Sequence, residues 1–272
     1  MLIEQIIVLA VVQGLTEFLP ISSSGHLILI PALTGWSDQG VVTDVMVHLG
    51  SLFAIIVYFW RDVVMLFRGA GDLLRGQITQ SAKLLIYLAL STIPIIAVGL
   101  LLVSTGLQSY LRGVHVVAYT AIGFGLLLYI ADRWGERVKR VEDMTLTNAV
   151  LIGCAQAIAL IPGTSRSGIT ITAGRLLGFK RTEAARFSFL LGIPAISSAT
   201  IFTGLEVWLN GDEISSDAWL AAGLAFFSAI FAIWLLMALI KRVSFLPFMI
   251  YRLVLGLTLL LAIEGWLPGL TL

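Results

Sequence analysis

The chain has 272 residues, of which 58% are hydrophobic and 12% are charged, with a formal net charge of +1 and a mean hydropathy of +0.99. A typical soluble domain has about 25% charged residues, so this composition excludes an ordinary soluble fold and indicates a protein embedded in a lipid bilayer. The net charge argues neither for nor against nucleic acid, and we expect no nucleic-acid partner. A single cysteine, Cys154, excludes an internal disulfide and a multi-cysteine metal cluster.

The apolar segments predict an all-α integral membrane protein that forms one domain. Residues 1–12 contain Glu4 and no basic residue, unlike a cleaved signal peptide, so we expect this segment in the mature protein. A spanning helix needs about 20 mostly apolar residues. Six stretches meet this requirement: 43–60, 84–107, 114–131, 186–205, 218–240 and 248–267.

Two other apolar stretches are too short to span the bilayer. Residues 2–12 and 148–161 each run into a tip rich in Gly, Pro and Ser, and a second short apolar piece follows each tip. Irregular backbone at membrane depth is tolerated only where protein or a water-filled cavity surrounds it. The pattern therefore predicts two re-entrant helix hairpins, at 2–35 and 148–178.

The basic residues predict the orientation. Fourteen of the seventeen lie in segments on one predicted side, at 61–83, 133–140, 175–186 and 241–242, and only Arg112 lies in the opposite loops. By the positive-inside rule the fourteen mark the cytoplasm, so both termini are predicted to face outward. The first hairpin then enters from outside and the second from inside.

This layout predicts an inverted repeat, with a first half at about 1–131 and a second at about 148–272. A shift of 143 residues brings seven identical residues into register over 23 positions. Gln13, Ser22 and Ser24 then coincide with Gln156, Ser165 and Ser167. Repeats of this kind place a binding site near the bilayer midplane, between broken helices.

The first tip, QGLTEFLPISSSGH at 13–26, has the residue types of an acid–base and nucleophile site. Gln13 and Glu17 are four residues apart and share one helix face. An ionisable carboxylate in a membrane segment is a functional candidate by default. We interpret the tip as a serine nucleophile, among Ser22, Ser23 and Ser24, beside Glu17 and His26. The alternative is that Glu17 and His26 pair with each other or cap a broken helix.

The second tip, PGTSRSGIT at 162–170, has the residue types of a phosphate site. Ser165 and Ser167 flank Arg166, and Thr170 follows. A guanidinium matches phosphate oxygens bidentately, and a following helix N-terminus favours an anion. The alternative is that Arg166 only pairs with Glu17.

Two further ionisable residues lie in apolar stretches. Arg252 is a candidate substrate ligand, with a structural ion pair to a residue such as Asp44 as the alternative. His48 is interpreted as a core residue rather than a ligand. A nucleophilic tip that meets an arginine tip at the midplane favours phosphoryl transfer on a phosphorylated lipid.

The chain closely resembles the undecaprenyl-diphosphate phosphatase family, also called the bacitracin resistance proteins, over nearly its whole length. The two tip motifs carry the resemblance, with weaker support from HLGSLFAIIVYFW at 48–60, RFSFLLGIPA at 186–195 and SFLPFMIYR at 244–252. The resemblance implies hydrolysis of undecaprenyl diphosphate to the monophosphate used in cell-wall synthesis. It also implies six spanning helices plus two re-entrant pairs in the bacterial inner membrane, with a cleft open to the periplasm.

The resemblance also implies roles for individual residues. The family's proposed nucleophile matches Ser23, its histidine matches His26, its phosphate-binding pair matches Ser165 and Arg166, and its late arginine matches Arg252. Many members have Glu where this chain has Gln13. Because a Gln cannot act as a base, Gln13 is interpreted as a substrate-binding residue that donates hydrogen bonds or helps to organise a metal. Members are helped by divalent cations, so magnesium or calcium is a candidate cofactor, although a single carboxylate in the tip disfavours tight metal binding.

These observations give one main hypothesis and two rivals. In the main one, Ser23 attacks the terminal phosphorus, Glu17 or His26 takes its proton, and Arg166, Ser165, Ser167 and Arg252 hold the phosphoryl oxygens. Direct attack by water stays open. The first rival is a polyprenyl-phosphate transporter or flippase, and the second is an ion channel or proton-coupled antiporter that uses Glu17. The oligomeric state, a homodimer included, is left open by the sequence.

Overall fold

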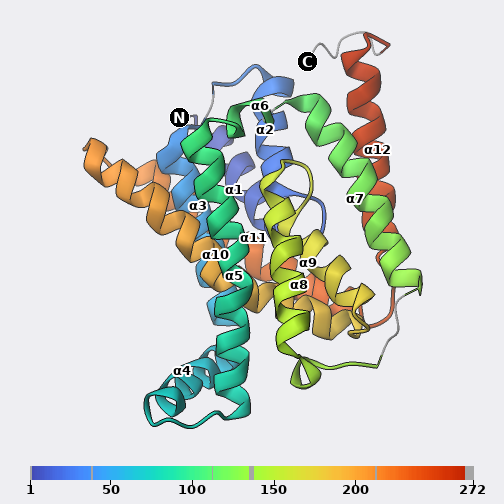
Figure 1. Cartoon of the computed structure of the whole chain (residues 1–272). Coiled ribbons are helices and arrows are strands. Elements are labelled where there is room, and N and C mark those ends of the chain that lie inside the picture. Colours follow the sequence, from blue (N-terminus) through green and yellow to red (C-terminus); the bar gives the residue numbers. More distant parts are fainter. Residues whose placement is uncertain (1, 38, 112, 135–137, 212, 267–272) are drawn as a thin grey trace.

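The computed structural model describes residues 2–37, 39–111, 113–134, 138–211 and 213–266, and these form helices joined by short loops. Among them, six helices are long and apolar enough to cross a membrane (Figure 1). They are α3 (Gly40–Tyr58), α5 (Gln80–Thr105), α7 (Val114–Trp134), α10 (Arg181–Asn210), α11 (Ser216–Leu239) and α12 (Leu246–Ile263). Each of the six predicted spans coincides with one of these helices to within a few residues, and α10 extends beyond both of its predicted ends. Arg112 and Arg137 of the charge count and residue 267 of the last span lie outside the described residues.

Two pairs of shorter helices occupy the segments predicted as hairpins. The first pair is α1 (Ile3–Phe18) and α2 (Ser23–Thr34). The second pair is α8 (Leu146–Ala157), extended by the 3₁₀ turn η2 (Ile158–Leu160), and α9 (Arg166–Leu176). In both pairs the connection between the two helices lies at the polar tip of the sequence, and the other residues of the tip belong to the adjoining helices.

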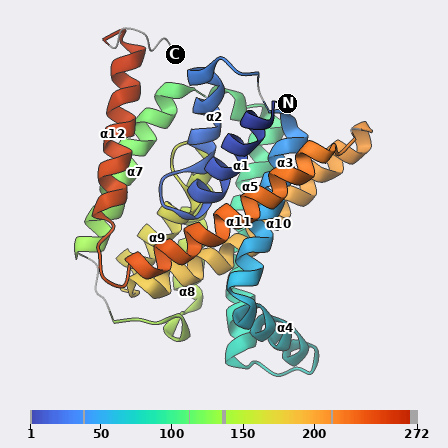
Figure 2. The same ribbon diagram turned by 180° about the vertical axis from the view of Figure 1, so that it is seen from behind.

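Three elements were not predicted from the sequence: α4 (Trp60–Leu74), the short α6 (Gln108–Leu111) and the 3₁₀ turn η1 (Val141–Asp143). Helix α4 begins directly after α3, and its residues are partly or fully exposed apart from the buried Gly69. It lies at the end of the molecule opposite the start of α1 and the end of α12 (Figures 1 and 2). Its mixture of apolar and charged residues is too polar for a span, which is why a search for spans omitted it.

Helix α11 is a scaffold on which α1 and α3 pack. One face of α11 consists of buried alanines: Ala218, Ala221, Ala222, Ala225, Ala229 and Ala232. The facing helices contribute glycines, since a Cβ at Gly50 would lie 2.1 Å from the carbonyl oxygen of Ala222, and one at Gly14 would lie 2.6 Å from that of Ala225. Small residues let helix backbones approach closely, which is the main source of packing energy within a bilayer. Gly14 therefore fixes the helix that carries Glu17.

A buried ion cluster fixes the helix that carries Arg166. Asp132, near the end of α7, accepts hydrogen bonds from Arg175 of α9 at 3.1 Å and from Arg181 of α10 at 2.7 Å. Asp132 and Arg175 are almost completely buried. A buried carboxylate needs such partners because loss of one would leave an uncompensated charge. The cluster thus locks α9 between α7 and α10.

Candidate active site

The two tips adopt the same unusual backbone turn. Ser22 has φ 76° and Ser165 has φ 72°, a left-handed region that non-glycine residues rarely adopt. Each serine then caps the helix that follows, since the Oγ of Ser22 accepts from the Gly25 amide and the Oγ of Ser165 accepts from the Gly168 amide. Strained backbone of this kind concentrates at functional sites. The turns place the N-termini of α2 and α9, which favour anions, at one pocket.

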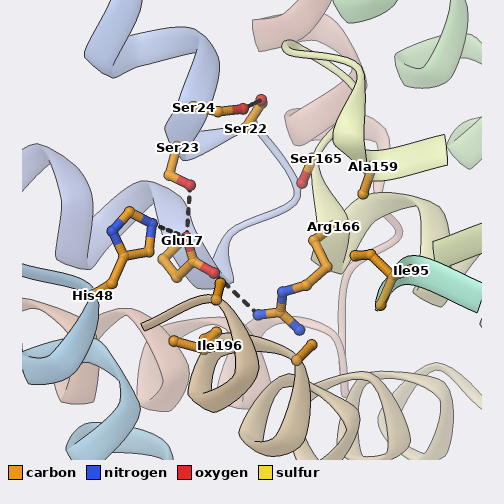
Figure 3. A pocket seen from close by; sticks show the side chains of 12 residues that line it. Glu17, Ser22, Ser23, Ser24, His48, Ile95, Ala159, Ser165, Arg166 and Ile196 are labelled. Carbon is orange, nitrogen blue, oxygen red and sulfur yellow. Dashed lines mark hydrogen bonds and ion pairs between the residues drawn. The ribbon is translucent and has the colours of Figure 1, made fainter. Parts of the chain in front are cut away.

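The pocket between the tips has a volume of about 180 Å³. Its polar wall comprises Glu17, Ser22, Ser23, Ser24, His48, Ser165 and Arg166 (Figure 3). Its apolar wall comprises Ile95, Ala159, Ala195, Ile196 and Ala199. A pocket that is polar on one side and apolar on the other suits an amphiphile.

Glu17 is the centre of the polar wall, with its side chain only 7% exposed. Its Oε2 accepts a 2.6 Å hydrogen bond from the Ser23 hydroxyl and a 3.1 Å bond from the Gln13 amide. Its Oε1 accepts a 3.2 Å bond from Nη2 of Arg166. The predicted common face of Gln13 and Glu17 is confirmed. The structure also selects Ser23 among the three serines as the one bonded to a carboxylate.

Arg166 pairs with Glu17, as the alternative interpretation stated, but this pairing does not use all of its donors. Nη1 of Arg166 donates to the carbonyl oxygen of Ser188 at 3.2 Å. Its Nε is buried and has no hydrogen-bond partner among the described residues. A buried charged donor without an acceptor is costly, so an oxygen of a bound anion in the pocket is its expected partner.

The remaining polar residues of the second tip, Ser167 and Thr170, hold the tip in place through hydrogen bonds to neighbouring segments. The Ser167 hydroxyl donates to the Leu19 carbonyl at 3.3 Å and so ties the second tip to the first. The Thr170 hydroxyl bonds the carbonyl oxygen of Arg166 at 2.8 Å and the Ser188 hydroxyl at 2.7 Å. Ser167 and Thr170 are buried and are not among the residues that line the pocket. Direct contact of either with a substrate stays a prediction.

His26 lies differently from the expectation of an acid–base group beside Ser23. Its Nδ1 is 2.6 Å from the carbonyl oxygen of Ser22, and its Nε2 is 2.5 Å from the Tyr251 hydroxyl. Its ring stacks on that of Tyr251 with an interplanar angle of 12°. With both nitrogens bonded, His26 orients the start of α2 in this structure. The contact with Tyr251 was not predicted, because a tyrosine in an apolar span gives no signal of a histidine far away in the sequence.

The interpretation of His48 as a core residue is wrong. His48 lines the pocket with its side chain 34% exposed, and its Nε2 lies 3.9 Å from Oε2 of Glu17. Its Nδ1 is 2.7 Å from the carbonyl oxygen of Asp44, one turn earlier on α3. The sequence held the relevant signal, since the predicted span placed His48 at membrane depth.

Arg252 is completely buried and bonds backbone carbonyl oxygens rather than Asp44. Its guanidinium donates to Pro20 of the first tip at 3.3 Å and to Gly163 of the second tip at 2.8 Å. It also donates to Ala121 and Thr120 of α7. Arg252 therefore braces the two tips against each other. Its predicted contact with phosphate stays a prediction.

The residues present do not fit a tightly held divalent cation. Calcium takes several oxygen ligands from the protein, and magnesium is held by one or two carboxylates together with water and substrate phosphates. Among the described residues no group of three or more His, Cys, Asp or Glu side chains is placed to hold a metal. Glu17 is the one carboxylate in the pocket wall and is already paired with Arg166. The Oε1 of Gln13 is a buried acceptor without a partner among the described residues, but an amide oxygen adds no charge.

Comparisons with known proteins show which family the chain resembles. A family model described as "Bacitracin resistance protein BacA" matches residues 6–258. A relative from Roseobacter denitrificans, named undecaprenyl-diphosphatase, is 50% identical over 262 residues, which cover 96% of this chain and 98% of the relative. Relatives with the same name from Jannaschia sp. and Ruegeria pomeroyi are 51% and 49% identical and cover 93% and 94% of this chain. These alignments cover 95% and 96% of the two relatives.

Proposed function

The chain belongs to the BacA family of bacitracin resistance proteins, and we propose on this premise that it is a membrane-embedded phosphatase that hydrolyses undecaprenyl diphosphate to undecaprenyl phosphate and inorganic phosphate. The observation that carries the proposal is the 2.6 Å hydrogen bond from the Ser23 hydroxyl to Glu17, opposite a guanidinium with an unused buried donor. The reaction would recycle the carrier lipid for peptidoglycan synthesis and so confer bacitracin resistance.

The proposed reaction begins with attack by Ser23. Glu17 accepts the hydroxyl proton as the Oγ–P bond forms and the bridging P–O bond breaks, and the electron pair leaves with the lipid monophosphate. Arg166 and the N-termini of α2 and α9 stabilise the charge on the transferring phosphoryl group. Glu17 loses the hydroxyl proton to solvent and then accepts a proton from the water that attacks the phosphoserine. Glu17 passes that second proton to the Oγ of Ser23 as the Oγ–P bond breaks and phosphate leaves.

The pocket also accounts for a lipid substrate. The diphosphate occupies the polar wall, and the polyprenyl tail leaves along Ile95 of α5 and Ala199 of α10. A divalent cation that assists the reaction would arrive on the diphosphate oxygens, because the protein alone offers too few ligands.

We further propose that the two helix pairs are re-entrant and belong to an inverted repeat. The matching φ values and caps of Ser22 and Ser165 support this reading. The placement of α4, with its basic residues, opposite the start of α1 and the end of α12 supports outward-facing termini (Figure 2). The pocket would then open to the periplasmic side of the bacterial inner membrane.

Phosphate release from undecaprenyl diphosphate by detergent-purified protein tests the proposed function. Ser23→Ala removes the hydroxyl that attacks, so we expect the rate to fall by about a hundredfold or more relative to wild type. Ser109→Ala, in the exposed α6, is the matched control and should keep the wild-type rate. A polyprenyl-phosphate transporter would instead move lipid between vesicle leaflets, and Ser23→Ala would leave that movement largely intact. Well-folded wild-type protein that releases no phosphate would refute the phosphatase.

Gly192 of α10 gives a second test, because it makes room for Arg166. A Cβ at position 192 would lie 2.6 Å from Nη1 of Arg166. The guanidinium is the flexible end of a side chain, so Gly192→Ala should displace Arg166 rather than unfold α10. We expect kcat/KM for phosphate release to fall roughly 10- to 100-fold, the usual effect of misplacing a catalytic group by about 1 Å. Gly223→Ala in α11, where a Cβ meets nothing within 4 Å, should have no effect.

A further inference from the structure

His48 offers the pocket an imidazole nitrogen with a fixed protonation pattern. Its Nδ1 is 2.7 Å from the carbonyl oxygen of Asp44, and a carbonyl accepts only, so Nδ1 carries the proton. In the neutral ring, Nε2 therefore carries the lone pair. Figure 3 shows this nitrogen directed at Glu17, and it lies 3.9 Å from Oε2, the oxygen that also accepts from Ser23.

His26 does not offer such a nitrogen in this structure. Its Nδ1 is engaged with the Ser22 carbonyl, and its Nε2 with the Tyr251 hydroxyl. Of the three histidines, His115 is exposed near the start of α7 and is not among the residues that line the pocket. His48 is therefore the histidine whose ring nitrogen faces both Glu17 and the cavity.

The charges around His48 favour transfer of a proton to it. Glu17 from α1 and Arg166 from α9 face it as an ion pair, Ser23 from α2 is neutral, and the α10 wall beside the pocket is apolar. On its own helix, the Asp44 carboxylate accepts from Gln39. A guanidinium favours the ionised form of an adjacent carboxylate, so Arg166 opposes lasting protonation of Glu17. The neutral imidazole of His48 needs only a small side-chain movement to reach Oε2 of Glu17. It is therefore a suitable acceptor for the proton on that carboxyl.

We propose that His48 is a proton-relay residue that takes from Glu17 the proton released by Ser23. This inference rests on the proposed function and deepens it. In the first half-reaction the Ser23 proton passes through Oε2 of Glu17 to Nε2 of His48, while the Oγ–P bond forms and the bridging P–O bond breaks. Glu17 is thereby ionised again and ready to accept the proton of the attacking water. That second proton returns to Ser23, and the imidazolium releases its own proton to the departing phosphate or to solvent.

The relay predicts a specific pH dependence of kcat/KM. A protonated imidazole cannot accept the proton, so the rate of the wild type should fall on acidification. His48→Gln keeps a polar side chain of similar reach but cannot take up a proton. We expect this variant to lose about 10- to 100-fold in kcat/KM at neutral pH, and to lose the acidic limb of the pH profile.

The experiment measures phosphate release from undecaprenyl diphosphate between pH 5 and 9 by wild type, His48→Gln, His48→Ala and the control His115→Gln. Added imidazole should restore part of the rate of His48→Ala, because the side chain borders an open pocket, and His115→Gln should match wild type. If His48→Gln is slower but its pH profile has the same shape as that of wild type, the relay is overturned and His48 has only a structural role. A His48→Gln rate equal to that of wild type would also overturn the relay. Wild-type protein that releases no phosphate at any pH would refute the proposed phosphatase function itself. This outcome differs from failure of the relay alone, in which the wild type is active.

Discussion

Replacing Arg166 with alanine is expected to reduce phosphate release by about a thousandfold, the usual scale for removing an arginine that stabilises a transferring phosphoryl group. Arg166 is the guanidinium in the pocket wall, and its buried Nε has no partner among the described residues. Arg166→Lys keeps the charge but loses the planar fork, so its rate should lie between those of wild type and Arg166→Ala. Equal rates for wild type and Arg166→Ala would refute the assignment.

The same substitution has a second consequence, for stability. Arg166 and Glu17 form a largely buried ion pair at 3.2 Å, and removal of one partner from such a pair costs about 3 to 5 kcal/mol. Loss of activity through unfolding must therefore be separated from loss of chemistry. The double variant Glu17→Gln/Arg166→Gln removes both charges together. We expect it to unfold at a temperature closer to wild type than Arg166→Ala does, and still to release no measurable phosphate.

Replacing Glu17 with glutamine is expected to reduce phosphate release by about a thousandfold, within the range for loss of a general base. A glutamine at this position can still accept a hydrogen bond from Ser23, but it cannot take the proton that leaves as the Oγ–P bond forms. The reduction should appear in kcat more than in KM, because the lost proton transfer belongs to the transition state.

Gln13→Ala provides the comparison for Glu17→Gln. Gln13 donates to the same Oε2 at 3.1 Å but is not among the residues that line the pocket. Its loss should disturb the orientation of the carboxylate without removing the base, so the Gln13→Ala rate should exceed the Glu17→Gln rate clearly. Similar losses in the two variants would mean that Glu17 acts through its hydrogen-bond geometry rather than as a proton acceptor.

Hydrophobic runs long enough for a bilayer determined the main architecture. Each of the six predicted spans matches a helix, because length and apolar content are local properties of the sequence. The positions of the two polar tips could also be predicted from the sequence, since Gly, Pro, Ser and charged residues interrupt the apolar segments there. Helix α4 was missed because its residues are neither apolar enough for a span nor polar enough for a loop.

The roles of the histidines and of Arg252 depended on contacts between distant segments. His26 was a natural candidate base because it follows the serines, yet Tyr251, 225 residues later, holds its ring nitrogen. Arg252 reads as an unexplained cation in a span, and only the fold brings Pro20 and Gly163 to its guanidinium. Side-chain orientation of this kind is set by long-range packing, which no local pattern encodes.

The sequence by itself determined that the protein is an all-helical membrane protein with two chemically distinct tips, because hydropathy and residue type are read position by position. The tertiary structure alone decided that Ser23 rather than its neighbours meets Glu17, and that His48 rather than His26 faces that carboxylate. Adjacent serines in a turn point in different directions. Which of them reaches a carboxylate depends on the left-handed turn at Ser22 and on the close packing of α1 and α3 against α11.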